Sequence, residues 1–279
     1  MTLIGKSADT LLRSSGKRIE ILPAKRRAMI LEHLRAHGAT AIGELAAALG
    51  GSQSTVRRDL EHLMEGGYLE RTRGGALLVP PLEATFELEP SINAQMHRAQ
   101  KLAIGKAAAA MLNPRESVIF DGSSTVAEAV RAATERGIPL TAITNSLDIG
   151  LVCSGIPSWR VIMPGGTVRT GTRLLVGDIG DAFFKSVHAD VCFTGAVAVT
   201  GTMLTDASLE VSALKRAMIQ SARRTVLLVD SSKFTAPAFC TFGDLSAIDE
   251  IVTDDGIDAE VLDNLRSLRT KVTLVEASS

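Results

Sequence analysis

The stretch AIGELAAALGGSQSTVRRDLEHLMEGGYLERTRGGALLV, residues Ala41–Val79, decides the fold of the N-terminal part of the chain. Apolar residues recur at helical spacing before the pair Gly50–Gly51 and again after it. Glycine can adopt the backbone angles of a sharp turn between two helices, so the pattern predicts two short helices around a tight turn. Ser52 or Ser54 can cap the second of them.

The second half of this stretch predicts a β-hairpin. Gly66 and Gly67 end the helical pattern, and Tyr68–Val79 reads as two short strands around Arg73–Gly75. A hairpin that directly follows a turn-spaced helix pair is a wing, which can lie along the sugar-phosphate backbone beside the groove that holds the recognition helix. With an earlier helix over Ala24–Ala36, the sequence predicts a winged helix-turn-helix DNA-binding domain over residues 23–79.

The side chains predicted to face double-stranded DNA lie on three elements of this domain. An arginine pair on a helix is usually a solvated face, but here it lies at the exposed start of the predicted recognition helix, and the wing follows at once. The candidates are Lys25, Arg26 and Arg27 on the first helix, Ser52, Gln53, Ser54, Thr55, Arg57 and Arg58 on the recognition helix, and Arg71 and Arg73 on the wing.

Length and composition set the class of protein. The 279 residues suggest two domains, and the formal net charge of -1 means that DNA affinity must come from local basic clusters. The three cysteines and five histidines show no metal-ligand spacing apart from His33 and His37, which lack a third ligand nearby. No apolar stretch approaches the roughly 20 residues of a membrane span. We therefore expect a cytoplasmic protein without a metal, a cofactor or a membrane partner.

Composition also divides the chain. Residues 1–22 are polar, lack a secretory signal and suggest a flexible extension, and residues 80–90, PPLEATFELEP, suggest a linker. Ser91–Ala110 is expected to form one long helix with Arg98, Lys101 and Lys106 on its polar side. This helix would open a second domain over residues 91–279.

In this second domain, apolar β-branched runs alternate with amphipathic stretches. The runs are SVIF, LTAIT, RVIMP, DVCFT, TVLLVD, DEIVT and KVTLVE. Such alternation is typical of βαβ units, and it predicts a mostly parallel sheet covered by helices on both faces. Ligands of such sheets bind at the carboxyl ends of the strands.

Polar residues follow several of the predicted strands. Hydroxyl residues at a helix start offer side chains and free N–H groups to an anion, carboxylates can hold sugar hydroxyls, and lysine or arginine can meet charge. This combination favours a small phosphorylated sugar or polyol as ligand. The candidates are Asp121, Gly122, Ser123, Ser124 and Thr125 after the first strand, Thr144, Asn145 and Ser146 after the second, Gly165, Gly166 and Arg169 after the third, then Asp206, Glu210 and Lys233.

Several segments resemble one known family. ELAAALGGSQSTVRRDLEHLMEGGYLERTRGGA resembles the N-terminal signature of DeoR-type bacterial transcriptional regulators, and FDGSST, ITNSLDIG, PGG, LKRAMIQSA and VDSSKF occur in the order of their C-terminal sensor. The resemblance covers about residues 24–255. It implies an α/β chain in which the winged helix is followed by a mostly parallel, Rossmann-like sensor domain similar to ribose-phosphate isomerase and glucosamine-phosphate deaminase.

The resemblance also implies site residues. It places the phosphate loop on Ser123, Ser124 and Thr125, and the effector contacts on Asp121, Asn145, Ser146, Gly166, Arg169, Asp206, Glu210 and Lys233. Three positions depart from the family pattern, which usually has glycine at Ser123, valine at Gly51 and glycine at Ala198. The first departure puts close backbone approach to a phosphate in question, and the second removes a contact between the two helices.

We expect a repressor of a sugar or sugar-phosphate catabolic operon whose operator affinity is altered by a phosphorylated sugar. Repression is a family expectation. The alternative is an isomerase-like enzyme in which Asp206 and Glu210 shuttle protons, although no histidine stands near the predicted strand ends. An effector-free architectural DNA binder would leave the polar strand ends unexplained. A homo-oligomer, a dimer or a tetramer, is expected because one winged helix reads too few base pairs.

Overall fold

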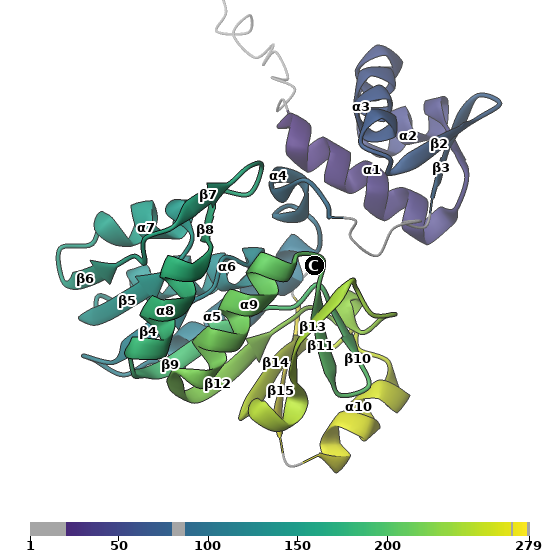
Figure 1. Ribbon diagram of the computed structural model, residues 1–279. Coiled ribbons are helices and arrows are strands. Elements are labelled where there is room, and N and C mark those ends of the chain that lie inside the picture. The colour runs from purple at the N-terminus through teal and green to yellow at the C-terminus, as the bar shows by residue number, and fades with distance from the viewer. Residues whose placement is uncertain (1–20, 80–86, 269, 278–279) are drawn as a thin grey trace, which may run out of the picture.

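The computed structural model describes residues 21–79, 87–268 and 270–277, so most of the predicted extension and linker lies outside the described residues. Figure 1 shows a small helical part with a hairpin, and a larger part built around a twisted sheet. We call the first part the reader and the second the sensor. Within the described ranges, no helix is both long and apolar enough to cross a lipid bilayer.

The reader is the predicted winged helix-turn-helix. Its helices are α1 (Pro23–His37), α2 (Ile42–Ala48) and α3 (Gln53–Glu65), and its three-stranded antiparallel sheet has the order β1-β3-β2, with β1 Thr40–Ala41, β2 Leu69–Thr72 and β3 Gly75–Leu78. All three helices turn apolar side chains inward, and the largest fully buried ones are Ile30, Leu34, Leu45 and Leu63. This confirms the fold predicted from Ala41–Val79.

Local interactions explain where the recognition helix begins and ends. Gly50 adopts a φ of 62° in the turn, and the Ser52 side chain accepts a hydrogen bond of 3.2 Å from the Thr55 N–H, so Ser52 is the cap. Gly66 follows the last helical residue, and Gly67 has a φ of 75°. A side chain at Gly51 would meet nothing within 4 Å. Glycine in place of the valine usual in the family therefore leaves no cavity in the core at this position.

The single long helix expected over Ser91–Ala110 is wrong. The structure has α4 (Pro90–Asn93) and α5 (Arg98–Ala110), and between them His97 takes a left-handed φ of 49°. Ile92 and Met96 fill the core of the reader, whereas α5 packs in the core of the sensor. The chain breaks its helix because the two halves are buried in different cores.

The sensor contains a seven-stranded parallel sheet of order β15-β14-β12-β9-β4-β5-β6. All seven predicted runs are strands of this sheet: β4 Ser117–Phe120, β5 Leu140–Thr144, β6 Trp159–Ile162, β9 Ala189–Thr194, β12 Ala222–Leu228, β14 Glu250–Asp254 and β15 Lys271–Val275. The predicted α/β class, with a mostly parallel sheet, is confirmed.

Helices cover both faces of the sheet, as Figure 1 shows. One face carries α5, α6 (Ser124–Glu135) and α7 (Leu147–Ser154), and the other carries α8 (Asp178–Ser186), α9 (Leu209–Gln220) and α10 (Ala259–Ser267). Along β12, Val226 and Leu228 enter the first core while Leu227 enters the second, because successive strand residues point to opposite faces. The continuous apolar runs of the sequence follow from this double burial.

The sensor also contains short elements outside the seven-stranded sheet that the sequence did not predict. They are the hairpin β7 (Thr167–Arg169) and β8 (Leu174–Val176), the antiparallel sheet β10 (Ala198–Thr200), β11 (Met203–Asp206) and β13 (Cys240–Asp244), and the 3-10 turns η1 (Ser231–Lys233) and η2 (Leu245–Ala247). Two of them matter for the site, because Arg169 ends β7 and Asp206 ends β11.

Candidate functional site

A cavity of about 740 Å³ lies at the carboxyl ends of β4 and β5 and extends to the reader. Ten of the fourteen predicted effector residues line it: Asp121, Gly122, Ser123, Ser124, Thr125, Asn145, Ser146, Arg169, Asp206 and Lys233. Reader residues contribute the opposite wall, including Leu31, Arg35, Tyr68 and Leu78. The structure therefore brings the polar ends of β4 and β5 together and places them opposite the reader.

Four predicted effector residues do not line the cavity. The Thr144 hydroxyl accepts a bond of 3.1 Å from the Ser146 N–H, and Gly165 and Gly166 are exposed. A side chain at Gly166 would lie 2.6 Å from the Val176 carbonyl oxygen, so this glycine has a structural reason. Glu210 is exposed and accepts a bond of 2.8 Å from the Ser208 hydroxyl, which lowers its pKa.

The start of α6 forms one wall of the cavity. The Ser123 hydroxyl accepts a bond of 3.3 Å from the Val126 N–H, and its own N–H donates to the Asp121 carboxylate at 2.8 Å. Ser123 is thus the cap of the helix, which explains the departure from glycine here. Gly195 faces it, and a side chain there would lie 2.6 Å from the Ser123 hydroxyl. Ser124 and Thr125 occupy the first turn, at the positive end of the helix dipole.

Asn145 contributes a polar atom that has no partner. Its Nδ2 donates to the Leu175 carbonyl oxygen at 3.1 Å, whereas its Oδ1 is buried and lacks a hydrogen-bond partner among the described residues. Burying an acceptor without a partner costs about 1–3 kcal/mol. Because Asn145 lines the cavity, a donor on a bound molecule can satisfy this oxygen.

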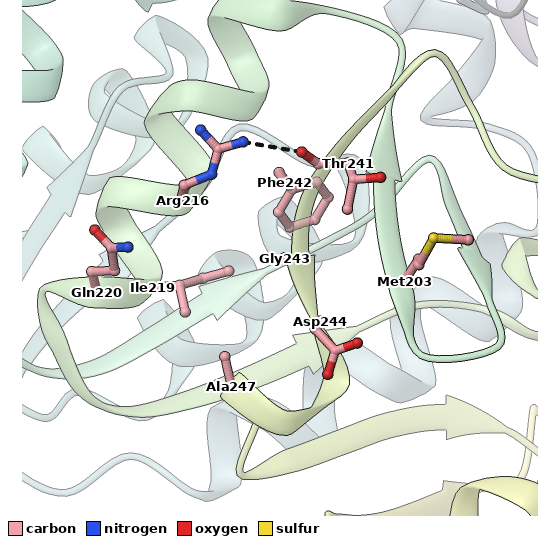
Figure 2. Close-up of a pocket in the computed structure, with 9 residues that line it drawn as sticks. All are labelled: Met203, Arg216, Ile219, Gln220, Thr241, Phe242, Gly243, Asp244 and Ala247. Carbon is pink, nitrogen blue, oxygen red and sulfur yellow. Dashed lines mark hydrogen bonds between the residues drawn. The ribbon is translucent and has the colours of Figure 1, made fainter.

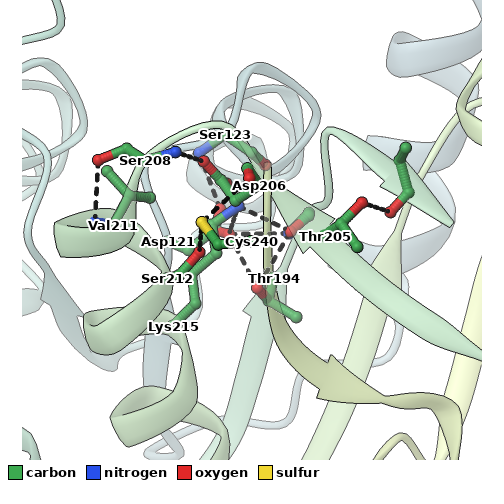
Figure 3. A network of polar contacts seen from close by, with 12 residues as sticks. Asp121, Ser123, Thr194, Thr205, Asp206, Ser208, Val211, Ser212, Lys215 and Cys240 are labelled. Carbon is green, nitrogen blue, oxygen red and sulfur yellow. Dashed lines mark hydrogen bonds and ion pairs between the residues drawn. The ribbon is translucent and has the colours of Figure 1, made fainter. Parts of the chain in front are cut away.

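A buried ion cluster lies beneath the start of α6, as Figure 3 shows. The Lys215 ammonium group is 2.9 Å from the Asp206 carboxylate, 3.5 Å from that of Asp121, and donates to the Gly195 carbonyl oxygen at 2.9 Å. Burial alone would lower the pKa of Lys215, but the two carboxylates outweigh it and raise the pKa. Asp121 also accepts bonds from Thr194 Oγ1 and the Gly195 N–H, so its position is fixed on every side.

Lys215 is a residue of this site that the sequence reasoning missed. The signal was present, because Lys215 occupies the apolar face of α9, four residues after Val211 and three before Met218. A lysine at such a position has to be paired when it is buried. The apolar period of the segment LKRAMIQSA around this lysine is therefore the feature that marks it as a buried, paired cation.

A second group of charges lies where η1 meets α5. Lys101 is buried rather than on the polar side of its helix, which corrects the expectation, and its ammonium group donates to the Asn93 carbonyl oxygen. Burial lowers the pKa of Lys101 to about 8, and the charge of Lys233 acts in the same direction. Burial would raise the pKa of Asp230, but the charge of Lys233 and the bond from Ser232 lower it.

The recognition helix and the wing present most of the predicted DNA contacts to solvent. Figure 1 shows α3 and the β2–β3 hairpin at the end of the reader that lies away from the sheet of the sensor. Thr55 is half-buried, and the exposed residues are Ser52, Gln53, Ser54, Arg57, Arg58, Arg71 and Arg73, with Lys25 exposed on α1. The predicted interface is therefore accessible.

Arg26 and Arg27 have a structural role that the sequence did not suggest. Both guanidinium groups pair with the buried Asp59 of α3, Arg26 through Oδ2 and Arg27 through Oδ1 at 3.2 Å. These bonds join α1 to the recognition helix. A direct contact between either arginine and DNA stays a prediction.

A second cavity, of about 460 Å³, lies between α9 and β13 (Figure 2). Its wall is largely apolar, with Met203, Ile219 and Phe242, and Arg216 closes one side by donating to the Thr241 carbonyl oxygen at 3.0 Å. None of the predicted site residues lines it. Across the described ranges, no group of three or more histidine, cysteine, aspartate or glutamate side chains could hold a metal ion.

Comparison with known proteins matches the reader and the sensor to two domains of one protein family. Residues 26–81 match the DeoR-like helix-turn-helix domain, and residues 96–255 match the DeoR C terminal sensor domain. A putative aga operon transcriptional repressor from Escherichia coli O157:H7 is 30% identical over 265 residues, which are 94% of this chain and 97% of that protein. The lactose phosphotransferase system repressor of Lactococcus lactis subsp. lactis is 30% identical over 250 residues, 88% of this chain and 96% of that one.

Among solved structures, ribose 5-phosphate isomerase A from Methanocaldococcus jannaschii is similar to 48% of this chain over 53% of its own. The identity is 18% and the TM-score 0.37, a likeness too low to support a functional argument.

Proposed function

Because this chain belongs to the DeoR family of DNA-binding transcriptional regulators, we propose that it represses genes of sugar catabolism and that a phosphorylated sugar in the sensor cavity alters its operator affinity. The chain is a regulator and not an enzyme, and relatives over nearly its whole length are named as repressors. One observation carries the proposal: a helix start, an unpaired buried acceptor and the cations Arg169 and Lys233 line one cavity that also contacts the reader.

The phosphate is assigned to the start of α6. Ser124 and Thr125 lie in the first turn of this helix of 12 residues, where backbone N–H groups and the helix dipole favour an anion. Lys233 and Arg169 line the same cavity and add positive charge. The buried Asp121 and Asp206 do not oppose an anion fully, because Lys215 neutralises part of their charge.

The sugar is assigned to the side of Asn145. A phosphate offers only acceptors at its ionised oxygens, so it cannot satisfy the unpaired Asn145 Oδ1, whereas a hydroxyl group can. A cavity of about 740 Å³ is within the range of small-molecule sites. A molecule with one phosphate and several hydroxyls fits both requirements.

Operator recognition is assigned to α3 and the wing. Arg57 and Arg58 are exposed near the start of α3, and Arg71 and Arg73 are exposed on the hairpin, where side chains of this kind reach base edges or phosphates. At least a dimer is needed, because a single winged helix contacts too few base pairs to be specific in a genome.

The test is thermal stabilisation of the protein by a panel of pentose and hexose phosphates, each beside its unphosphorylated sugar. A true ligand raises the melting temperature by mass action, and the free sugar should not. Ser124→Asp sets a carboxylate against the phosphate and should abolish the stabilisation, while Ser246→Asp, which adds the same charge at an exposed position of η2, should not. Equal stabilisation of Ser124→Asp and wild type would remove the assigned phosphate position.

A further inference from the structure

We propose that Glu87 is part of the ligand site: its carboxylate occupies Arg169 in the ligand-free protein, and an anionic group of the ligand has to displace it. The proposal rests on the proposed function, because it assumes that the cavity binds an anion. It adds a residue that the sequence assigned to the linker, and it names the contact that ligand binding must break.

The geometry is that of a recognised anion. Arg169 Nη1 donates to Glu87 Oε2 at 2.9 Å, and Arg169 Nη2 donates to Glu87 Oε1 at 3.3 Å. Two parallel bonds from one guanidinium group are the way in which arginine binds carboxylates and phosphates. Both residues line the cavity, and each side chain is 27% exposed, so a ligand can reach the pair. The protein's own carboxylate thus holds the donors that a ligand anion requires.

Glu87 is closely connected to the recognition helix. Leu88 packs against the reader core, and the Glu89 carboxylate accepts a bond of 3.0 Å from His62 of α3. The Glu89 N–H also donates to the Tyr68 hydroxyl at 2.9 Å, immediately before the wing. Residues 87–89 therefore run from an arginine of the sensor to the helix that is assigned to the operator. A ligand that expels Glu87 from Arg169 acts on this segment directly.

The energetic consequence is a competition. An ion pair of this exposure contributes up to about 1 kcal/mol, which corresponds to a factor of about five in affinity. The pair therefore weakens ligand binding by this factor in the wild type. The ligand prefers the state with the pair broken over the state with the pair intact by the same factor, and it can shift the position of the reader by no more than this preference. Removing the carboxylate should strengthen anion binding, because the ligand then no longer has to break the Glu87–Arg169 contact of the free protein.

The experiment measures binding of inorganic phosphate by thermal stabilisation in a phosphate-free buffer. Glu87→Gln should bind phosphate about fivefold more tightly than wild type. Glu135→Gln, an exposed position near the end of α6, removes the same charge and should change nothing. Arg169→Gln should weaken phosphate binding, and in that background Glu87→Gln should have no further effect. Hydrogen exchange of α3 should rise on phosphate addition in wild type and be raised already in Glu87→Gln.

Each outcome decides. The proposal is overturned if Glu87→Gln binds phosphate as wild type does, or if Glu87→Gln and Glu135→Gln raise the phosphate affinity equally. It is also overturned if Glu87→Gln still raises the affinity in the Arg169→Gln background, or if phosphate leaves the hydrogen exchange of α3 unchanged. Failure of the proposed function is separate. If sugar phosphates stabilise wild type while Glu87→Gln behaves as wild type, the function stands and the role of Glu87 falls. If Glu87→Gln raises the affinity for phosphate but no sugar phosphate binds, the role of Glu87 toward an anion stands and the proposed function falls.

Discussion

Replacing Lys215 by methionine should destabilise the sensor strongly, because it leaves two buried carboxylates without their cation. The Lys215 side chain is 8% exposed, and its ammonium group lies 2.9 Å from Asp206, 2.9 Å from the Gly195 carbonyl oxygen and 3.5 Å from Asp121. Methionine has a similar length and packs well, so the loss concerns charge rather than volume. Removing one partner of a buried pair costs about 3–5 kcal/mol, and we expect a loss in this range at pH 7.

The matched control is Lys185→Met. Lys185 pairs with Asp181 one helical turn away, but its side chain is 62% exposed, and exposed pairs of this kind contribute about 0.3–0.5 kcal/mol. Urea unfolding followed by fluorescence of Trp159 reports on the sensor alone, because this buried residue of β6 is the single tryptophan of the chain. A loss for Lys215→Met within about 1 kcal/mol of the control would refute the reasoning, since a breakable buried pair costs several times more.

The pH dependence of this difference follows from the direction of the shift. The folded state raises the pKa of Lys215 above the ordinary lysine value of about 10.4. Its contribution is therefore fully present below pH ~10.4 and is lost only as the pH rises through the folded-state pKa. We expect the gap between wild type and Lys215→Met to stay constant from about pH 7 to pH 10. A gap that shrinks across this interval would contradict the charged state of Lys215.

Three further outcomes are expected. Arg57→Ala and Arg58→Ala should each weaken operator binding in gel shifts without lowering the melting temperature; a phosphate contact would also reduce the salt slope by about 1, and a base contact would relax sequence preference. Asp59→Asn should lower the stability of the reader by about 1.5–3 kcal/mol, which is the contribution of hydrogen bonds to a charged group. The loss should appear as faster hydrogen exchange in α1 and α3. Cys153 should resist alkylation up to about pH 10, because burial raises its pKa to about 12, whereas the half-exposed Cys240 should react first in mass spectrometry.

The strands and the reader could be predicted from the sequence because both depend on local pattern. Strands buried on both faces give continuous apolar runs, and all seven such runs form the sheet. The recognition helix carries its own cap and its own terminating glycines. These signals are local in the sequence, so they do not depend on contacts with distant segments.

The parts that failed depend on contacts between distant segments. The break at His97 has no local signal, because it arises from two cores that bury Ile92 and Ile104 separately. The pairing of Arg169 with Glu87 joins residues 82 positions apart, and the hairpin that carries Arg169 is three residues long on each strand. Lys215 was recognisable in principle, since a lysine on an apolar helix face requires partners, but the sequence does not say which ones.

The burial of Ile92 and Met96 in the reader bears on how such regulators can be recombined. Both residues lie past the hairpin in the chain, yet they are 0% and 2% exposed within the helical core. A fusion that cuts after Val79 would leave their places empty, and full burial of such a side chain contributes about 1.5–3 kcal/mol. A transplantable DNA-binding unit therefore has to extend through Met96. Its new host then inherits Glu87 and Glu89, so exchanging one half of the molecule also exchanges the means by which the halves communicate.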